Sequence, residues 1–263
     1  MGFFDTYAKY DINNINFGCQ RGQVWKCDNQ YIIIDDILNI KNYDIIKNKM
    51  FQACITFPPY NANKKDLYGN SFDDNKSDYV DWQLKVINIL NQLIKGYLNY
   101  NIMYNSNARS DYIDIVYKTI KETDFELIDT AIWRKNRGYY GDSYKYLFRR
   151  FEYIFMFNND NHNAYKCKPK SNVIDIFNHS QNLVGFNASF PLELVYYFLD
   201  LTTEENDLII EPFAGTGTVL IACQHKKRVS YNIEINPNFV NIMLNRFFIE
   251  TNIKPILVLK NGA

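Results

Sequence analysis

The sequence of 263 residues lacks several features that would place it in a specialised class of protein. No stretch approaches the roughly 18 apolar residues that a membrane-spanning helix needs, so no membrane partner is expected. Residues 1–20 contain no apolar run long enough for a secretory signal peptide. Neither sign of charge prevails, because 29 basic residues balance 29 acidic ones. Any contact with a polyanion must therefore come from a local basic patch.

Cysteine and histidine are too few and too scattered to suggest a metal centre. The five cysteines show no paired short spacing of the kind that zinc sites use, and His162, His179 and His225 show none either. We therefore expect no metal, and free thiols in a reducing compartment, the cytoplasm. Apolar residues make up 47% of the chain and aromatic residues 16%, which is enough for a buried sheet.

Short β-branched runs alternate with helical patterns along most of the chain. We expect strands at residues 31–34, 53–56, 97–104, 125–133, 151–157, 208–211 and 229–235. We expect helices from a Ser77 or Asp78 cap to Gly96, from Ser110 with Ile113, Val116 and Ile120, at 191–199, after Gly217, and at 238–248. Such alternation predicts a single α/β domain over residues 1–263, with a mostly parallel sheet covered on both faces.

A glycine-containing turn connects the predicted strand 208–211 to the helix that follows. Gly215 and Gly217 let the backbone approach a ligand closely, and the helix N-terminus offers free amide donors. The pattern also fits an ordinary strand-to-helix connection. About twenty residues on, Glu234 ends the next strand, where nucleotide-binding folds place a carboxylate against ribose hydroxyls. Together the two features indicate a cofactor that contains adenosine.

The turn from Glu211 to Thr218 resembles the Asp-Pro-Phe-x-Gly-x-Gly-Thr turn of DNA amino-methyltransferases, with Glu211 in place of Asp. The resemblance implies that S-adenosylmethionine is the cofactor and that Glu234 holds its ribose. It assigns the segment 188–191 to the methionine moiety, and Asp36 to the adenine end, with Asp35 replacing the family's Gly. The implied cofactor-binding residues are Asp36, Phe190, Pro191, Glu211, Pro212, Phe213, Gly215, Gly217, Thr218 and Glu234.

Residues 55–61, with the sequence ITFPPYN, resemble the catalytic loop of the same family. Its usual form is Asp, Asn or Ser followed by Pro-Pro-Tyr. Two prolines fix the backbone so that the first proline's carbonyl can face a substrate amine, while the aromatic ring stacks on the base. A plain Pro-Pro turn is the alternative interpretation. The implied catalytic residues are Phe57, Pro58, Pro59 and Tyr60.

Phe57 departs from this pattern because it has no oxygen. An exocyclic base amine is a poor nucleophile, and hydrogen-bond acceptors aimed at its protons help to localise its lone pair. Losing one positioned polar group costs roughly 10² to 10³ in rate. Three interpretations remain: activity through the Pro58 carbonyl, an acceptor borrowed from Thr56 or Asn61, or a catalytically silent DNA-binding homologue. In this family, Ser at the position of Phe57 is associated with cytosine N4, and Asp or Asn there with adenine N6. Thr56 and Asn61 on either side resemble the Ser form, so cytosine N4 is favoured over adenine N6.

The catalytic loop precedes the cofactor turn, as in the permuted beta class of these enzymes. The resemblance spans most of residues 31–248 and implies a three-layer Rossmann-like methyltransferase fold. It places a small target-recognition insert around residues 134–184, with Lys166, Lys168 and Lys170 as candidate phosphate contacts. A nicotinamide oxidoreductase is disfavoured because the turn lacks a third glycine.

The implied partner is DNA, and a homodimer and a cognate restriction enzyme are compatible with this family. Cations alternate with aromatic residues between Trp133 and Arg150, a pattern that suits phosphate contacts and base stacking. The alternative is a solvated loop with tyrosines packed on the sheet. The candidate DNA-binding residues are Arg134, Lys135, Arg137, Arg149 and Arg150.

Overall fold

The computed structural model describes residues 15–61, 78–103, 110–139, 147, 149–160, 164–168, 171–176 and 190–259, without the side chains of residues 136–139 and 149. The strands are β1 (Val24–Cys27), β2 (Gln30–Ile33), β3 (Phe51–Thr56), β4 (Ile94–Ile102), β5 (Glu126–Tyr139), β6 (Arg149–Asn158), β7 (Val173–Ile174), β8 (Leu208–Glu211), β9 (Val229–Ile233) and β10 (Ile256–Leu259). The helices are η3 (Ile37–Asn42), α2 (Tyr79–Leu93), α3 (Asp111–Glu122), α4 (Leu192–Thr202), α5 (Thr218–His225) and α6 (Pro237–Thr251).

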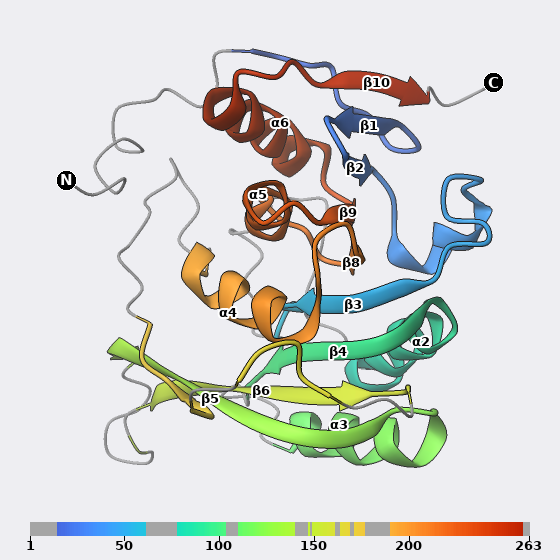
Figure 1. Cartoon of the computed structure of the whole chain (residues 1–263). Coiled ribbons are helices and arrows are strands. Elements are labelled where there is room, and N and C mark those ends of the chain that lie inside the picture. Colours follow the sequence, from blue (N-terminus) through green and yellow to red (C-terminus); the bar gives the residue numbers. More distant parts are fainter. Residues whose placement is uncertain are drawn as a thin grey trace.

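All ten strands form one sheet in the order β10-β1-β2-β9-β8-β3-β4-β6-β5-β7 (Figure 1). Its centre, from β2 through β9, β8 and β3 to β4, is parallel. Antiparallel pairs flank this centre, β10 with β1 and β1 with β2 on one side, and β4 with β6 and β6 with β5 on the other. The carboxyl ends of β2, β9, β8 and β3 therefore lie side by side at one edge.

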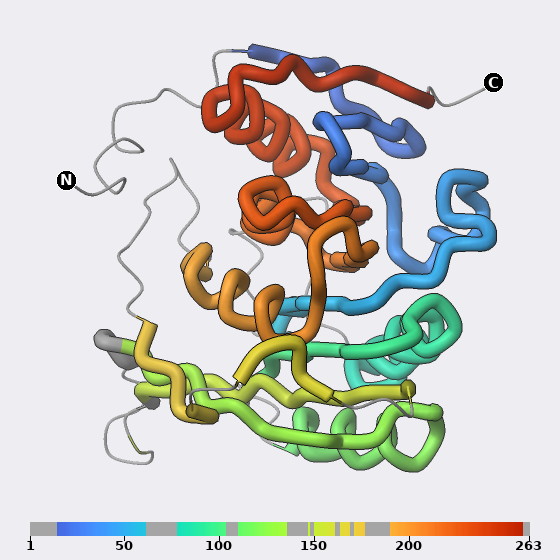
Figure 2. The backbone as a smooth tube through the Cα atoms, viewed as in Figure 1, coloured from blue at the N-terminus to red at the C-terminus, as the bar shows by residue number. Residues whose placement is uncertain are grey.

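Alternating side chains of the central strands enter two separate apolar cores. In β3, Ala53 and Ile55 pack in the core shared with α4, α5 and α6, whereas Phe51 and Cys54 pack in the core shared with η3 and α2. Figures 1 and 2 show α4, α5 and α6 on one side of the sheet and α2 and α3 on the other. This is the predicted three-layer α/β/α arrangement, because both faces of a parallel sheet must be covered.

Local sequence signals explain where the helices near the glycine turn begin and end. The Asn236 side chain accepts a hydrogen bond from the Asn238 amide at 3.0 Å, and Pro237 occupies the first helical turn of α6. That helix ends at Asn252, whose φ of 56° is left-handed. At the start of α5, Gly217 occupies the N-cap position with a φ of 85°.

Two expectations about the helices differ from the structure. Gly96 does not end α2, because the helix stops at Leu93 and β4 begins at the next residue. The glycine lies inside β4, where the chain runs against β3. In α3 the predicted apolar side is largely uncovered: Ile113 and Ile120 are 54% and 40% exposed and Val116 is half-buried, whereas the buried residues are Ile115 and Thr119. Of the two candidate caps of α2, Asp78 holds the N-cap position and Ser77 lies outside the described residues.

All five cysteines are unpaired in the structure. Across the described ranges, none of the helices combines the length and the apolar character that a bilayer crossing requires. The same ranges contain no group of three or more His, Cys, Asp or Glu side chains placed to hold a metal ion.

We predict that Gly96→Ala destabilises the fold by roughly 2 to 4 kcal/mol. Its φ is 142°, and a Cβ there would collide with the backbone carbonyl oxygen of Gln52. Gly18→Ala is a matched control, because its φ of 68° is also positive but nothing lies within 4 Å of the added Cβ. This control should cost about 1 kcal/mol. Urea unfolding of both variants decides the point, and equal losses would show that the approach to Gln52 is not tight.

Candidate functional site

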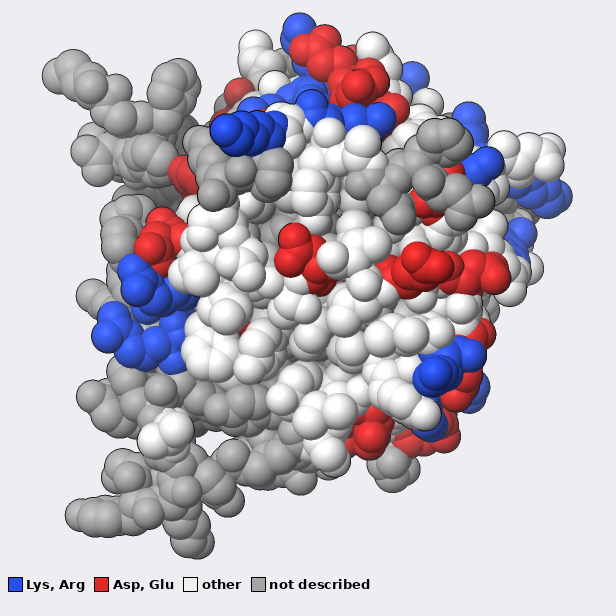
Figure 3. Space-filling view, turned by 60° about the horizontal axis from the view of Figure 1, so that its bottom comes forward, with Lys and Arg blue, Asp and Glu red and all other residues white. Residues whose placement is uncertain are grey.

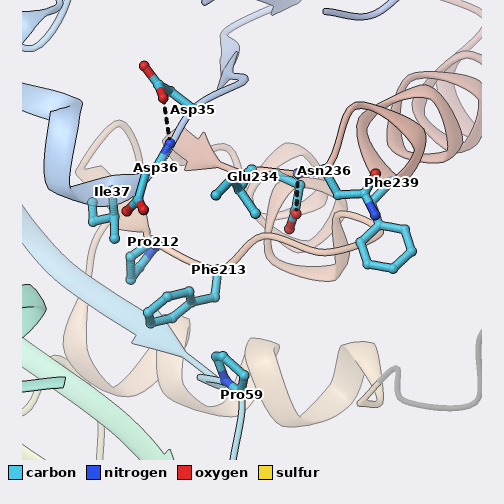
Figure 4. A pocket seen from close by; sticks show the side chains of 10 residues that line it. Asp35, Asp36, Ile37, Pro59, Pro212, Phe213, Glu234, Asn236 and Phe239 are labelled. Atoms are coloured by element: carbon cyan, nitrogen blue, oxygen red, sulfur yellow. Dashed lines mark hydrogen bonds between the residues drawn. The ribbon is translucent and has the colours of Figure 1, made fainter. Parts of the chain in front are cut away.

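A pocket lies at the carboxyl edge of the parallel strands (Figure 4). Segments that follow β2, β3, β8 and β9 contribute to it. The residues that line the pocket are Asp35, Asp36, Ile37, Pro59, Pro212, Phe213, Glu234, Ile235, Asn236 and Phe239. The structure thus brings Asp36, Pro59, Pro212, Phe213 and Glu234 together, all of which are sequence-predicted site residues.

Glu234 connects the glycine turn to the start of α6. Its Oε2 accepts a hydrogen bond from the Gly215 amide at 2.7 Å, and its Oε1 accepts one from the Asn236 amide at 2.8 Å. Burial raises the pKa of Glu234 to about 7, although the amides of Asn236, Gly215 and Ile235 act to lower it. The carboxyl group therefore fixes the shape of the turn and presents a polar group to the pocket.

The two glycines of the turn meet different surroundings. A Cβ on Gly217 would collide with the Met243 side chain of α6, so this glycine allows α5 and α6 to pack closely. At Gly215, with a φ of 53°, nothing lies within 4 Å of an added Cβ. The following residue, Thr216, is bound by Arg246 of α6, whose Nη1 donates to the Thr216 carbonyl at 2.6 Å. The open side of the turn is therefore at Gly215.

Glu211, at the end of β8, joins the glycine turn to the Pro-Pro-Tyr loop. Its Oε1 accepts from Thr56 Oγ1 at 2.8 Å and from the Phe213 amide at 2.9 Å. Within the described part of the chain, its buried Oε2 has no hydrogen-bond partner. Burial raises the pKa of Glu211 to about 8, and nearby Glu234 adds to the rise. Because Thr56 directly precedes Phe57, this carboxyl group sets the position at which the loop leaves the sheet.

Asp35 and Asp36, which follow β2, accept hydrogen bonds from different groups. The Asp36 side chain caps η3 by accepting from the Leu38 amide at 3.0 Å. Asp35, in place of the family's Gly, accepts hydrogen bonds from four donors: Tyr43 Oη at 2.7 Å, the Asp36 amide at 2.7 Å, and Asn39 and Arg21 at 3.1 Å. Burial acts to raise the pKa of Asp35, but these hydrogen bonds hold it below its ordinary value. The substitution therefore anchors this wall of the pocket.

The Pro-Pro-Tyr loop, predicted to be catalytic, contacts the segment predicted to bind the methionine moiety. The rings of Phe57 and Phe190 stack with their centroids 3.5 Å apart and their planes 14° from parallel. The Pro59 carbonyl accepts a hydrogen bond from Tyr79 Oη at 2.7 Å. Pro191 occupies the N-cap position of α4, and residues 188 and 189 lie outside the described ranges. Phe57 is thus packed against an apolar partner at the position where the family has a polar side chain.

The hydroxyl group of Tyr60 points to two polar side chains that the sequence did not single out. It donates to Asn101 Oδ1 near the end of β4, and it lies 3.2 Å from Glu152 Oε2 in β6. Glu152 was visible in the sequence as a charged residue in an otherwise apolar strand. Nothing in the spacing connected it to a loop that lies about 90 residues earlier in the chain.

Two of the candidate DNA-binding side chains, Arg134 and Lys135, are engaged in ion pairs. Arg134 forms a two-pronged pair with Asp175, at 2.5 and 2.7 Å. Lys135 pairs with Glu152 and lies 4.6 Å from the centre of the Trp133 ring. Arg150, Lys166 and Lys168 are exposed, whereas Lys170 and the side chains of Arg137 and Arg149 are outside the described part. In the view of Figure 3, uncharged and acidic side chains occupy the centre of the face, and Lys and Arg lie toward its margins.

The parallel-centred sheet, the glycine turn, the acidic strand end and the Pro-Pro-Tyr loop at one edge define a Rossmann-like methyltransferase. The sequence profile of the N6/N4 methyltransferases, described as DNA methylase, matches residues 51–245. The chain belongs to this DNA methylase family.

Individual relatives resemble the chain in sequence, and solved structures resemble it in fold. M.BslI, a type II beta methyltransferase from Bacillus sp. strain NEB-606, is 25% identical over 80% of the chain, but the chain spans only 27% of M.BslI. The structure of the PvuII DNA methyltransferase, described as cytosine-N4-specific, superimposes with a TM-score of 0.68 at 18% identity, covering 94% of this chain and 92% of that one. For the M1.HpyAVI-SAM complex the TM-score is 0.62 at 20% identity, with 82% and 98% covered. These similarities confirm the predicted fold.

We predict that the stability of the cofactor-free chain falls between about pH 5 and pH 8. Burial raises the pKa of Glu234 from 4.5 to about 7 and that of Glu211 to about 8. In this window the folded chain therefore holds more protons than the unfolded chain, and stability decreases as pH rises. Glu234→Gln and Glu211→Gln, which cannot ionise, should each weaken this dependence in urea unfolding at pH 5, 6.5 and 8. An unchanged pH dependence of the unfolding free energy in both variants would contradict the raised pKa values of Glu234 and Glu211.

Proposed function

We propose that the protein transfers a methyl group from S-adenosylmethionine to an exocyclic amine of a base in DNA. The observation that carries this proposal is the meeting of the Pro-Pro-Tyr loop with the cofactor turn, because Pro59 lines the same pocket as Pro212, Phe213 and Glu234. Membership of the DNA methylase family supports it. So does the bound cofactor of the structurally similar M1.HpyAVI complex.

The chemistry of the pocket suits this cofactor better than a dinucleotide. Three carboxyl side chains, Asp35, Asp36 and Glu234, line it together with apolar groups of Phe213 and Phe239, and none of the described lining residues is Lys or Arg. A pyrophosphate would be repelled there, whereas a sulfonium cation would be attracted. In this proposal Glu234 accepts hydrogen bonds from ribose hydroxyls, and Asp36 lies at the adenine end. The bound cofactor supplies an electrophilic methyl group.

The chain's own part in the reaction is to hold the target amine and to shape its surroundings. The carbonyl of Pro58 accepts a hydrogen bond from the amine, and the ring of Tyr60 stacks on the base. Thr56 is a poor source of a second acceptor, because it is fully buried and donates its hydroxyl proton to Glu211. The stacked pair of Phe57 and Phe190 forms an apolar wall in place of that acceptor.

Cytosine N4 is the target amine that we favour over adenine N6. The surroundings of the catalytic loop resemble the Ser form of the family, and the PvuII enzyme with a similar fold is described as cytosine-N4-specific. The alternative of a catalytically silent DNA-binding homologue rests on Phe57 alone, and no other observation favours it. In duplex DNA the base would have to be extruded, at a cost of a few kcal/mol.

Contacts with DNA are proposed on the insert around residues 134–184. The exposed Arg150, Lys166 and Lys168 are candidates for phosphate contacts, and Arg134 would join them by leaving Asp175. Because the charges of the whole chain balance, such local contacts must supply the attraction. On the family resemblance alone, we also propose that the chain forms a homodimer and has a cognate restriction enzyme.

We predict that the protein incorporates labelled methyl groups from S-adenosylmethionine into mixed-sequence DNA, and that nucleoside analysis identifies N4-methylcytosine. Gly217→Val is the negative control, since its side chain collides with Met243 and disturbs the cofactor turn. Methyladenine as the only product would overturn the choice of base. An absence of product on cytosine, adenine and guanine, in a sample that binds the cofactor, would overturn the proposed function.

We predict that Phe57→Ser transfers methyl groups up to about 10²-fold faster than Phe57→Ala. Both substitutions abolish the stack with Phe190, but only Ser adds an oxygen at the position where the family has its acceptor. The comparison of kcat therefore separates the loss of packing from the gain of an acceptor. Equal rates in the two variants would mean that the acceptor is supplied from another part of the site.

A further inference from the structure

The hydroxyl group of Tyr60 has a set of partners that stacking on a base does not require. An aromatic ring alone provides the stacking surface. In the structure the single proton of this hydroxyl group is shared between two acceptors, Asn101 Oδ1 and Glu152 Oε2, the latter 3.2 Å away. These acceptors come from two neighbouring strands, β4 and β6, that pair antiparallel. The ring of the catalytic loop is thus tied at its far end to the sheet.

Both acceptors are themselves held in place. Asn101 is fully buried, and its Nδ2 donates to the Tyr153 carbonyl at 3.0 Å. The Glu152 side chain is only 14% exposed and forms an ion pair with Lys135, which is 28% exposed. Lys135 in turn lies over the Trp133 ring. Charge-assisted hydrogen bonds of this kind are the strong ones, and acceptors with little freedom orient their donor well.

We propose that Glu152 and Asn101 are positioning residues that fix the ring of Tyr60 through its hydroxyl group, and that Lys135 fixes Glu152. The proposal rests on the proposed methyl transfer and refines it. It assigns Lys135 to the catalytic loop instead of to the DNA backbone, because its ammonium group is engaged beside that loop. Its consequence is that the base meets a ring that is already oriented, which favours the reactive geometry over binding alone.

The alternative role for Glu152 is direct contact with the target base. A carboxylate can accept a hydrogen bond from an exocyclic amine, so loss of Glu152 would then act independently of the Tyr60 hydroxyl group. The two roles differ in how the effects of substitutions combine. If Glu152 acts through Tyr60, removing either partner removes the same interaction, and removing both costs little more.

The test compares Tyr60→Phe, Glu152→Ala, Glu152→Gln and the double variant Tyr60→Phe/Glu152→Ala in methyl transfer to DNA. We expect each of Tyr60→Phe and Glu152→Ala to lower kcat roughly tenfold with little change in the KM for the cofactor. The double variant should be no more than about twofold slower than Tyr60→Phe, which already lacks the hydroxyl group. Glu152→Gln should stay within about threefold of the wild type, because its amide oxygen still accepts from the hydroxyl group.

Glu126→Ala is the matched control. Glu126 is an exposed acid at the first residue of β5 and pairs with Asn158 at the last residue of β6, so it lies away from Glu152 and Lys135. It should leave kcat unchanged. Effects of Tyr60→Phe and Glu152→Ala that multiply in the double variant would overturn the proposal in favour of direct base contact. A wild-type kcat in Glu152→Ala would overturn it outright.

Urea unfolding of the same variants separates this proposal from the proposed function. Loss of one shared contact predicts that the double variant shifts the unfolding midpoint by less than the sum of the two single shifts. Shifts that add fully would show that Glu152 does not hold Tyr60, whatever the activity. If the wild type transfers no methyl group to DNA while the shifts remain non-additive, the proposed function fails and the contact stands.

Discussion

Parallel pairing of β2, β9, β8 and β3 is the constraint on which the rest of the molecule depends. In this register Ile33 lies opposite Ile233 and Cys54 opposite Ile210, so that strands about 155 to 200 residues apart in the chain end at one edge. Parallel strands send all their following loops to the same side. Asp36, the Pro-Pro-Tyr loop, the glycine turn and Glu234 meet for that reason, and no part of the site exists without the sheet.

Buried carboxyl groups then fix how these loops leave the sheet. Glu211 accepts hydrogen bonds from the Thr56 hydroxyl group and the Phe213 amide. Glu234 accepts hydrogen bonds from the amides of Gly215 and Asn236. Burying a carboxyl group is unfavourable unless hydrogen bonds compensate for lost hydration, which is why both groups have raised pKa values. One unused oxygen of Glu211 remains buried, within the described residues, at the junction of the two motifs.

Sequence patterns predicted the parallel core and the pocket walls, because strand ends and glycine turns are local signals. They did not predict β1 and β10: both are only four residues long, and three of the four side chains of β10 are exposed, so no burial pattern marks it. They also misplaced the end of α2, since Gly96 permits a close approach to β3 and does not end the helix. The partners of Tyr60 depend on contacts between distant strands, which no local pattern encodes.

The Pro-Pro-Tyr loop is held by two different kinds of interaction, and this bears on the catalytic role proposed for it without a side-chain oxygen at Phe57. At one end the Phe57 ring is stacked on Phe190, and at the other the Tyr60 hydroxyl group is tied to Asn101 and Glu152. A loop fixed at both ends has little freedom to lose when a base arrives. In the proposed reaction, its rigid Pro-Pro backbone would direct the Pro58 carbonyl at the amine. Orientation would thereby offset part of what the missing acceptor would have supplied.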